Sequence, residues 1–257
     1  MSNTTDGIVE WLRQRLARSG ARGFVFGLSG GIDSAVVARL CQIASPANVI
    51  GVLMPCHSDP RDEADARLVA DHFQIPTIRV DLAPSFDHFT AALQLAAKAL
   101  PADQRPAADE GSEDLKAQLP LANVKPRMRM TTLYFVANTL NYMVVGTGNR
   151  SELSIGYFTK YGDGGVDLLP IGELLKSEVR AAARDLGVPE PILEKPPGAG
   201  LWPGQTDEAE MGVTYDVLEH YLDKGAEAVA PALAMRIERL IRMSEHKRAI
   251  APTPGAE

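Results

Sequence analysis

Two serines, two adjacent glycines and an aspartate stand together near the N-terminus, in the segment Ser29-Gly30-Gly31-Ile32-Asp33-Ser34. The serines supply hydroxyl donors, and glycines let the backbone turn sharply and approach a ligand that a Cβ would obstruct. The first backbone N–H groups of a helix lack intrahelical partners and lie at the positive end of its dipole, so a helix starting here would attract an anion. The segment therefore predicts a phosphate-binding loop.

The loop lacks the lysine of a Walker-type loop, G-x-x-x-x-G-K-[ST], and carries Asp33 instead. A bare carboxylate repels a polyphosphate, whereas Mg²⁺ is commonly held by carboxylates together with substrate phosphates. We therefore expect Asp33 to be a magnesium ligand. The alternative is an ordinary glycine turn in which Asp33 only caps a helix.

The surrounding pattern alternates strands with helices. Apolar, β-prone runs predict strands at 24–28, 48–54, 77–82 and 143–147, and helical patterns cover 4–19, 35–41, 62–73, 86–100, 126–140, 173–186, 207–222 and 226–243. This order predicts an α/β fold, a doubly wound parallel sheet of about five strands flanked by helices, in a single domain over 1–257. Ligands in such sheets bind beyond the carboxyl ends of the strands, where the phosphate loop falls.

Composition excludes several classes of protein. A net charge of −7 argues against a nucleic-acid surface, and no apolar run or N-terminal signal pattern suggests a membrane or export. Cys41 and Cys56 form neither a disulfide framework nor a metal motif. We expect a cytoplasmic protein with no membrane and no nucleic-acid partner, and a mobile segment near 101–123, which is rich in Pro, Ala, Asp and Glu.

A second carboxylate follows the predicted strand 143–147, in Thr147-Gly148-Asn149-Arg150-Ser151-Glu152. Because parallel strands share one carboxyl edge, Glu152 is a candidate second ligand for the magnesium ion held by Asp33. Its alternative role is only to complement the dipole at the start of a helix. Further on, a glycine-rich loop brings Lys160 together with Asp163 or Asp167, which without other information is a surface turn.

The motif Ser-Gly-Gly-x-Asp-Ser resembles the signature of the ATP pyrophosphatases, and the chain from Asp6 to Arg248 resembles ammonia-dependent NAD synthetases. The stretch Phe-Thr-Lys-Tyr-Gly-Asp-Gly-Gly-Val-Asp-Leu-Leu-Pro at 158–170 is similar to a segment specific to that family. The resemblance implies a carbon–nitrogen ligase that converts deamido-NAD⁺, ATP and ammonia to NAD⁺, AMP and diphosphate through an acyl-adenylate, with Mg²⁺ as cofactor. It also implies a homodimer that binds deamido-NAD⁺ at its interface, which the apolar helix 126–140 suits.

The resemblance assigns roles residue by residue. It implies that ATP is bound by Gly27, Leu28, Ser29, Gly30, Gly31, Ile32, Asp33, Ser34, Thr147, Lys176 and Gly198. Deamido-NAD⁺ would be bound by Arg127, Phe158, Lys160, Asp167, His246 and Lys247, and magnesium by Asp33 and Glu152. Asp33, Lys160 and Lys176 would be catalytic. Relatives often carry Ser or Thr at the position of Gly198, so a side-chain contact to ATP is missing there.

Some alternatives remain open at this stage. Arg127 and Arg129 begin a predicted helix, where cations oppose the dipole, so they face either an anionic ligand or solvent; the resemblance assigns only Arg127. A tRNA-modifying ATP pyrophosphatase would share the phosphate loop but should show a basic surface and often paired cysteines. A non-catalytic nucleotide sensor would need no Glu152, Lys160 and Asp167 together. The length leaves no room for a glutamine-hydrolysing domain, so we expect free ammonia, or ammonia from another protein, as the nitrogen source.

Overall fold

Four parallel strands form the central sheet of the computed structural model, which describes residues 3–104, 115–196, 198 and 206–254. The strands are β1 (Gly23–Gly27), β2 (Val49–Leu53), β3 (Thr77–Arg79) and β4 (Tyr142–Val144), in the order β3-β2-β1-β4. The chain therefore winds outward from β1 to β3 and then returns to place β4 on the other side of β1. This confirms the doubly wound parallel sheet, with its switch point between β1 and β4.

About five strands were expected, and the described residues form four. A further extended segment reaches β4 but makes a single parallel bridge, between Leu168 and Val145. The Gly146 N–H donates to the Leu168 carbonyl at 2.8 Å, and Pro170 follows, which has no N–H to continue a ladder. The segment therefore ends before it becomes a strand.

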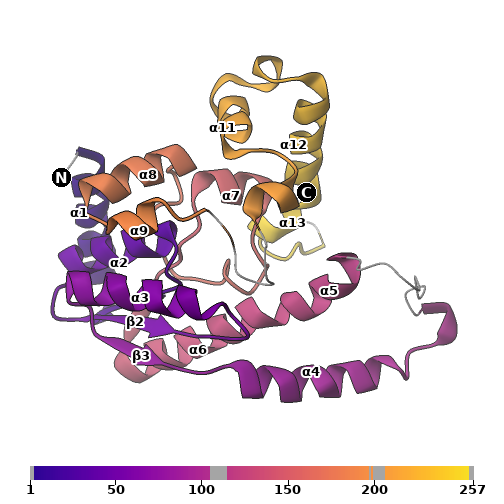
Figure 1. Cartoon of the computed structure of the whole chain (residues 1–257), viewed down its shortest axis with the longest axis horizontal. Coiled ribbons are helices and arrows are strands. Elements are labelled where there is room, and N and C mark those ends of the chain that lie inside the picture. The colour runs from indigo at the N-terminus through magenta and orange to yellow at the C-terminus, as the bar shows by residue number, and fades with distance from the viewer. Residues whose placement is uncertain (1–2, 105–114, 197, 199–205, 255–257) are drawn as a thin grey trace.

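Helices cover both faces of the sheet (Figure 1). One face packs against α1 (Asn3–Ser19), α2 (Ile32–Ala44), α3 (Pro60–Phe73), α8 (Lys176–Asp185) and α9 (Glu190–Leu193). The other packs against α4 (Ala83–Ala97) and α6 (Val124–Leu140). Side chains alternate between the faces along a strand, so Phe24 and Phe26 join the first core cluster while Val25 joins the second.

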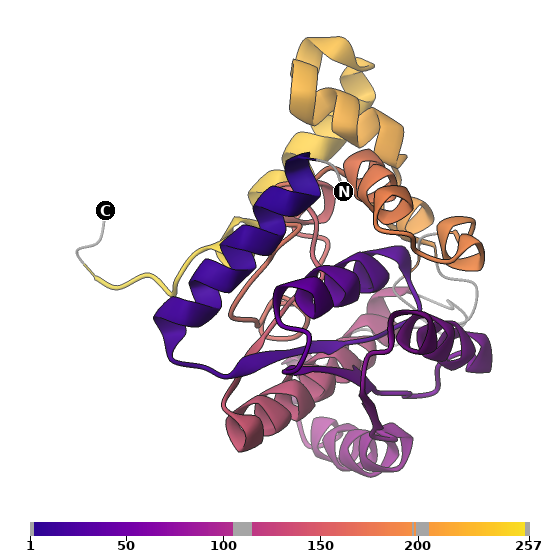
Figure 2. The same cartoon turned by 90° about the vertical axis from the view of Figure 1, so that its left-hand side faces the viewer.

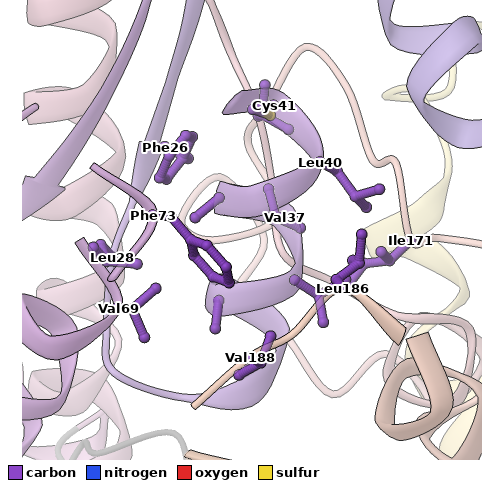
Figure 3. Packing of buried hydrophobic residues seen from close by; sticks show 14 of the residues in the cluster. Phe26, Leu28, Val37, Leu40, Cys41, Val69, Phe73, Ile171, Leu186 and Val188 are labelled. Carbon is purple, nitrogen blue, oxygen red and sulfur yellow. The ribbon is translucent and has the colours of Figure 1, made fainter. Parts of the chain in front are cut away.

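The larger core fixes the direction in which β1 leads into α2. Figure 3 shows Phe26 and Leu28 packed near Val37 of α2 and Phe73 of α3. These side chains are at most 6 % exposed, so the turn between β1 and α2 is anchored on both sides by buried residues. Rigid supports on both sides hold the phosphate loop in place.

The C-terminal helices form a separate small cluster that stands above the sheet (Figure 2). They are α10 (Asp207–Met211), α11 (Tyr215–Lys224), the 3₁₀ turn η2 (Ala226–Ala228), α12 (Pro231–Met243) and α13 (Glu245–Arg248). The single helices expected at 207–222 and 226–243 are therefore each divided. Gly212, with φ +65°, ends α10, and the Thr214 hydroxyl caps α11.

The remaining elements are η1 (Ala102–Gln104), α5 (Leu115–Ala122) and α7 (Arg150–Ile155). Helix α5 lies inside the segment 101–123 for which we expect mobility, and residues 105–114 lie outside the described residues. The mobility of that segment stays a prediction. Within the described part of the chain, no helix is both long enough and apolar enough to cross a membrane.

We predict that Gly156→Ala destabilises the fold much more than Gly187→Ala. Both glycines have left-handed backbones, with φ +69° and +73°, so each alanine costs about 1 kcal/mol of strain. A Cβ on Gly156 would lie 2.0 Å from Ser244 Cβ, whereas one on Gly187 meets open space. Urea unfolding should show an additional loss of about 2 kcal/mol for Gly156→Ala. Equal losses in the two variants would show that Ser244, between α12 and α13, does not pack on Gly156.

Candidate active site at the carboxyl edge of the sheet

The phosphate loop and the segment after β4 lie side by side at the switch point. The Val145 N–H donates to the Val25 carbonyl at 2.8 Å, which extends the pairing of β4 with β1 to the edge. The phosphate loop leaves the end of β1, and Thr147 and Asn149 follow β4. The expectation that both segments share one edge is confirmed.

The loop's own serines hold it in shape. The Ser34 hydroxyl donates to the Gly31 carbonyl at 2.8 Å, and the Ser29 hydroxyl donates to Ser34 Oγ at 3.1 Å. Gly30 has φ +77°, and a Cβ there would lie 2.4 Å from the Asp62 carbonyl oxygen, so only glycine fits. The N-cap residue of α2 is Gly31, which has no side chain to cap the helix, so the first N–H groups of α2 are suited to an anion.

Three of the predicted site residues meet at one buried ammonium group. Lys176, only 2 % exposed, places its Nζ 2.5 Å from Asp33 Oδ2 and 3.2 Å from Glu152 Oε1. Each of the three residues lies in the first turn of a helix, Asp33 in α2, Glu152 in α7 and Lys176 in α8. Helix α8 begins at Lys176, three residues later than the predicted start at 173. Asn149 Nδ2 also donates to Asp33 Oδ1 at 2.9 Å. We call Asp33, Glu152 and Lys176 the acid–lysine cluster.

Helix α7 positions Glu152 through a capping box. The Glu152 N–H donates to Asn149 Oδ1 at 3.0 Å, and the Asn149 N–H donates to Glu152 Oε2 at 3.5 Å. One carboxylate oxygen therefore serves the helix while the other faces Lys176. The structure therefore confirms that Glu152 begins a helix and lies near Asp33. Its role as a magnesium ligand stays a prediction.

Two further residues contact the cluster and were not among the site residues predicted from the sequence. The Tyr215 hydroxyl lies 3.2 Å from Glu152 Oε1 and 2.9 Å from Asp207 Oδ2, and its ring centroid lies 5.1 Å from Lys176 Nζ. Asp207 and Tyr215 come from α10 and α11, far from Glu152 in sequence. No local sequence pattern marks Tyr215 as a partner of Glu152.

The cluster carries more negative than positive charge. Burial lowers the pKa of Lys176, but Asp33 and Glu152 outweigh it, so the net pKa is raised and the lysine stays charged. Burial and the neighbouring Asp33 raise the pKa of Glu152 to about 7 although Lys176 opposes them. Burial likewise raises the pKa of Asp207. Two carboxylates on one ammonium, with Asp207 acting on the group from farther away, leave negative charge that suits an additional cation.

Most of the predicted deamido-NAD⁺ residues form a second group, around the loop 156–165 and α13. Arg127 donates from Nε and Nη2 to the Lys160 carbonyl at 3.3 Å, and Lys160 Nζ donates to the His246 carbonyl. Lys247 Nζ donates to the carbonyls of Gly156 and Phe158, both at 2.7 Å, and lies 5.4 Å from the Phe158 ring. These residues, distant in sequence, are therefore neighbours.

The carboxylate of Asp167 accepts hydrogen bonds from uncharged groups. Its Oδ2 accepts the Val144 N–H at 2.8 Å, and its Oδ1 accepts the Tyr134 hydroxyl at 2.9 Å. Within the described residues Lys160 makes no ion pair with Asp163 or with Asp167, since its Nζ donates to the His246 carbonyl. A role for these opposite charges in ligand binding stays a prediction. Asp167 remains exposed and open to a ligand.

The other ATP-binding candidates lie around the loop with different exposure. Leu28 and Ile32 are buried in the core, so only their backbone groups can face a ligand, and Gly27 ends β1. Thr147 is half-buried after β4, and Gly198 is exposed. Gly198 follows Lys195, whose Nζ lies 2.8 Å from Asp62 and 3.4 Å from the Gly30 carbonyl.

An anion-binding loop at the switch point of a parallel sheet, beside the buried acid–lysine cluster, is the arrangement expected of a nucleotide-binding α/β protein. A family model described as NAD synthase matches residues 4–251. The chain belongs to the NAD synthase family.

Named relatives agree over nearly the whole chain. An NH(3)-dependent NAD(+) synthetase from Carboxydothermus hydrogenoformans is 48% identical, over 97% of this chain and 96% of the relative. Among solved structures, an NMN synthetase from Francisella tularensis is similar with a TM-score of 0.86 and 36% identity, covering 98% of this chain and 97% of that one. An NH3-dependent NAD synthetase from Campylobacter jejuni has a TM-score of 0.76 and 28% identity, covering 98% and 99%.

We predict that the metal-free protein loses stability as the pH rises from about 4.5 to about 7. The pKa of Glu152 is raised from 4.5 to about 7, so between these values the folded chain binds more protons than the unfolded chain. The full loss is about 3 kcal/mol. Urea unfolding in EDTA across this range measures it, and Glu152→Gln should remove it. Exposed Glu173 provides the control, Glu173→Gln; an unchanged slope in Glu152→Gln would contradict the assignment.

Proposed function

We propose that this chain catalyses the ATP-dependent amidation of deamido-NAD⁺ with ammonia, giving NAD⁺, AMP and diphosphate. The observation that carries the proposal is the acid–lysine cluster next to an uncapped phosphate loop, where Lys176 Nζ lies 2.5 Å from Asp33. Family membership supports these substrates, and the cations and the aromatic ring gathered around loop 156–165 support binding of the dinucleotide there. The nucleotide-sensor and tRNA-modifying alternatives are not favoured.

The chemistry needs activation of a carboxylate. An oxygen of the pyridine carboxylate attacks the α-phosphorus of ATP, the bond to the β-phosphate oxygen breaks, and diphosphate leaves. Ammonia then attacks the acyl carbon, AMP leaves, and a proton is released. Lys176 and the N–H groups of the phosphate loop are placed to stabilise charge on the phosphates, so positioning and electrostatics carry the rate without a side-chain nucleophile.

Mg²⁺ fits the residues of the cluster. Asp33 and Glu152 offer oxygen ligands, and the negative charge that Lys176 leaves unbalanced suits a dication. Among the described residues no group of three or more His, Cys, Asp or Glu could hold a metal, so phosphates and water would complete its coordination, as is usual for magnesium. When bound, Mg²⁺ offsets the charge that develops on the phosphates.

Deamido-NAD⁺ would be held by the second group, where Arg127, Lys160 and Lys247 gather cations beside the Phe158 ring. An aromatic face suits a flat pyridinium ring. Exposed Tyr161 and Asp167 lie in the same loop region and are open to the ligand.

The likeness to an NMN synthetase favours a second candidate substrate, the carboxylic acid mononucleotide that gives NMN on amidation. It needs the same acid–lysine cluster and the same phosphate loop, and differs only in lacking the adenylate half. The relative rates with the two acids decide between them.

We predict ammonium-dependent NAD⁺ formation with equimolar AMP and diphosphate. Lys176→Met and Asp33→Asn should each lower kcat at least about 100-fold, because each removes a group that acts on charge developing at the phosphates. Lys224→Met is the matched control, since Lys224 makes a solvent-exposed pair with Asp223 at 2.7 Å.

The nitrogen source and substrate are varied in the same assay. Replacing ammonium with glutamine should abolish turnover, and the mononucleotide should react more slowly than deamido-NAD⁺. AMP formed only with another carboxylate would overturn the substrate while leaving the phosphate loop in place. Full activity in Lys176→Met would overturn the proposed mechanism.

We propose further that the chain works as a homodimer through α6. Phe135 on this helix is 72% exposed in the single chain, and an apolar side chain so exposed is suited to a partner surface. Phe135→Glu should shift the sedimentation coefficient from dimer to monomer. Met235→Glu, at a residue 64% exposed on α12, should leave it unchanged; a dimeric Phe135→Glu would place the interface elsewhere.

A further inference from the structure

Arg129 on α6 is a cation that the proposed mechanism has not used. Its Nε donates to the Met54 carbonyl and its Nη2 donates to the Ser58 hydroxyl, both at 3.3 Å. Both acceptors are uncharged and lie in the loop 54–59 between β2 and α3, which we call the β2 loop. Within the described residues Arg129 makes no ion pair with a carboxylate, whereas Arg61, Arg67 and Arg79 each make at least one.

The surroundings of Arg129 make this lack of an anion costly. Burial lowers the pKa of its guanidinium, although the side chain keeps part of its surface accessible. Buried Lys125, one turn earlier on α6, is a second cation whose own pKa is lowered by burial and by Arg129. Burying a charge that has no ion-pair partner in direct contact costs free energy, which a bound anion would offset.

The position of Arg129 places it between the two groups of the site. The loop that it contacts borders the phosphate loop, because the Leu28 N–H donates to the Val52 carbonyl at 3.0 Å and Met54 Cε would lie 3.2 Å from a Cβ on Gly27. The acidic residues that act on its charge are Asp163, in the loop 156–165, and Asp62, on α3 beside Gly30.

We propose that Arg129 binds a phosphate group of one of the two nucleotide substrates. A guanidinium has five N–H donors in a planar fork, and two nitrogens of Arg129 hold the β2 loop while the remaining donors stay available. The anchored nitrogens would fix the fork's direction before the ligand arrives. This inference deepens the proposed function and rests on it, since it takes both nucleotides from that reaction.

Direct binding tests the role without turnover. Isothermal titration with α,β-methylene ATP and, separately, with deamido-NAD⁺ should show at least about 10-fold weaker binding of one of them to Arg129→Gln, as expected for a lost charged hydrogen bond. The KM for the same nucleotide should rise in the steady-state assay. The affected nucleotide identifies the source of the phosphate. Arg129→Lys should recover only part of the affinity, because an ammonium keeps the charge but not the fork.

Ser58→Ala separates ligand binding from support of the β2 loop. It removes one acceptor of Arg129 without changing charge, and should alter both affinities less than about 3-fold. If Arg129→Gln binds both nucleotides as the wild type does, or if Ser58→Ala weakens binding as much as Arg129→Gln, the proposal is overturned. If Arg129→Gln does not fold, Arg129→Lys decides by the same criteria. Wild-type protein that binds the nucleotides but forms no NAD⁺ would contradict the proposed function alone.

Discussion

A buried ammonium group held by two carboxylates is the interaction on which this site depends. Lysine is seldom buried, and a buried charge is tolerable only when it is paired and hydrogen-bonded. Lys176 satisfies this condition by drawing Asp33 and Glu152 to within 2.5 and 3.2 Å of its Nζ. The three residues begin different helices, so the same contacts that neutralise the lysine also bring three helix N-termini to one place. Removing either carboxylate would leave a buried charge less compensated.

The parallel sheet makes that convergence possible. Because β1 and β4 are neighbours at the switch point, the phosphate loop and the Asn149–Glu152 capping box emerge beside each other. The cores on both faces then fix α2 and α6 against the strands, and Tyr215 closes the cluster from the C-terminal helices. Glycine turns and helix caps shape each segment locally. The strand order is what brings the phosphate loop and the capping box to the same edge of the sheet.

Sequence patterns predicted the local features well. The phosphate loop, the parallel strands and the start of α6 follow from glycine placement and apolar runs, and each falls within a few residues of its expected position. Gly212 divides 207–222 into two helices because its left-handed backbone ends α10. The helical periodicity on both sides of it favoured a single helix. The missing fifth strand depends on Pro170, whose effect requires knowing that β4 is its neighbour.

Long-range contacts could not be predicted from the residues alone. Lys176 at a helix start is typical of a solvated side chain, and its burial depends on Asp33, which is 143 residues away. Tyr215 has no local motif because its partner Glu152 is 63 residues away. Arg129 presents the same difficulty, since its position in the sequence is compatible with solvent and with an anionic ligand. Its burial against the β2 loop depends on contacts with Met54 and Ser58, more than 70 residues away. For Lys176 the local sequence left more than one role open, and only the resemblance to a family favoured one of them.

The central claim is that this site joins a carboxylate oxygen to the α-phosphorus of ATP. The most direct test is to supply deamido-NAD⁺ labelled with ¹⁸O in both carboxylate oxygens and to analyse the products by mass spectrometry. Attack on the α-phosphorus predicts that a single labelled oxygen appears in AMP while the other stays in the amide of NAD⁺. Unlabelled AMP, with the label in diphosphate or inorganic phosphate, would contradict the account.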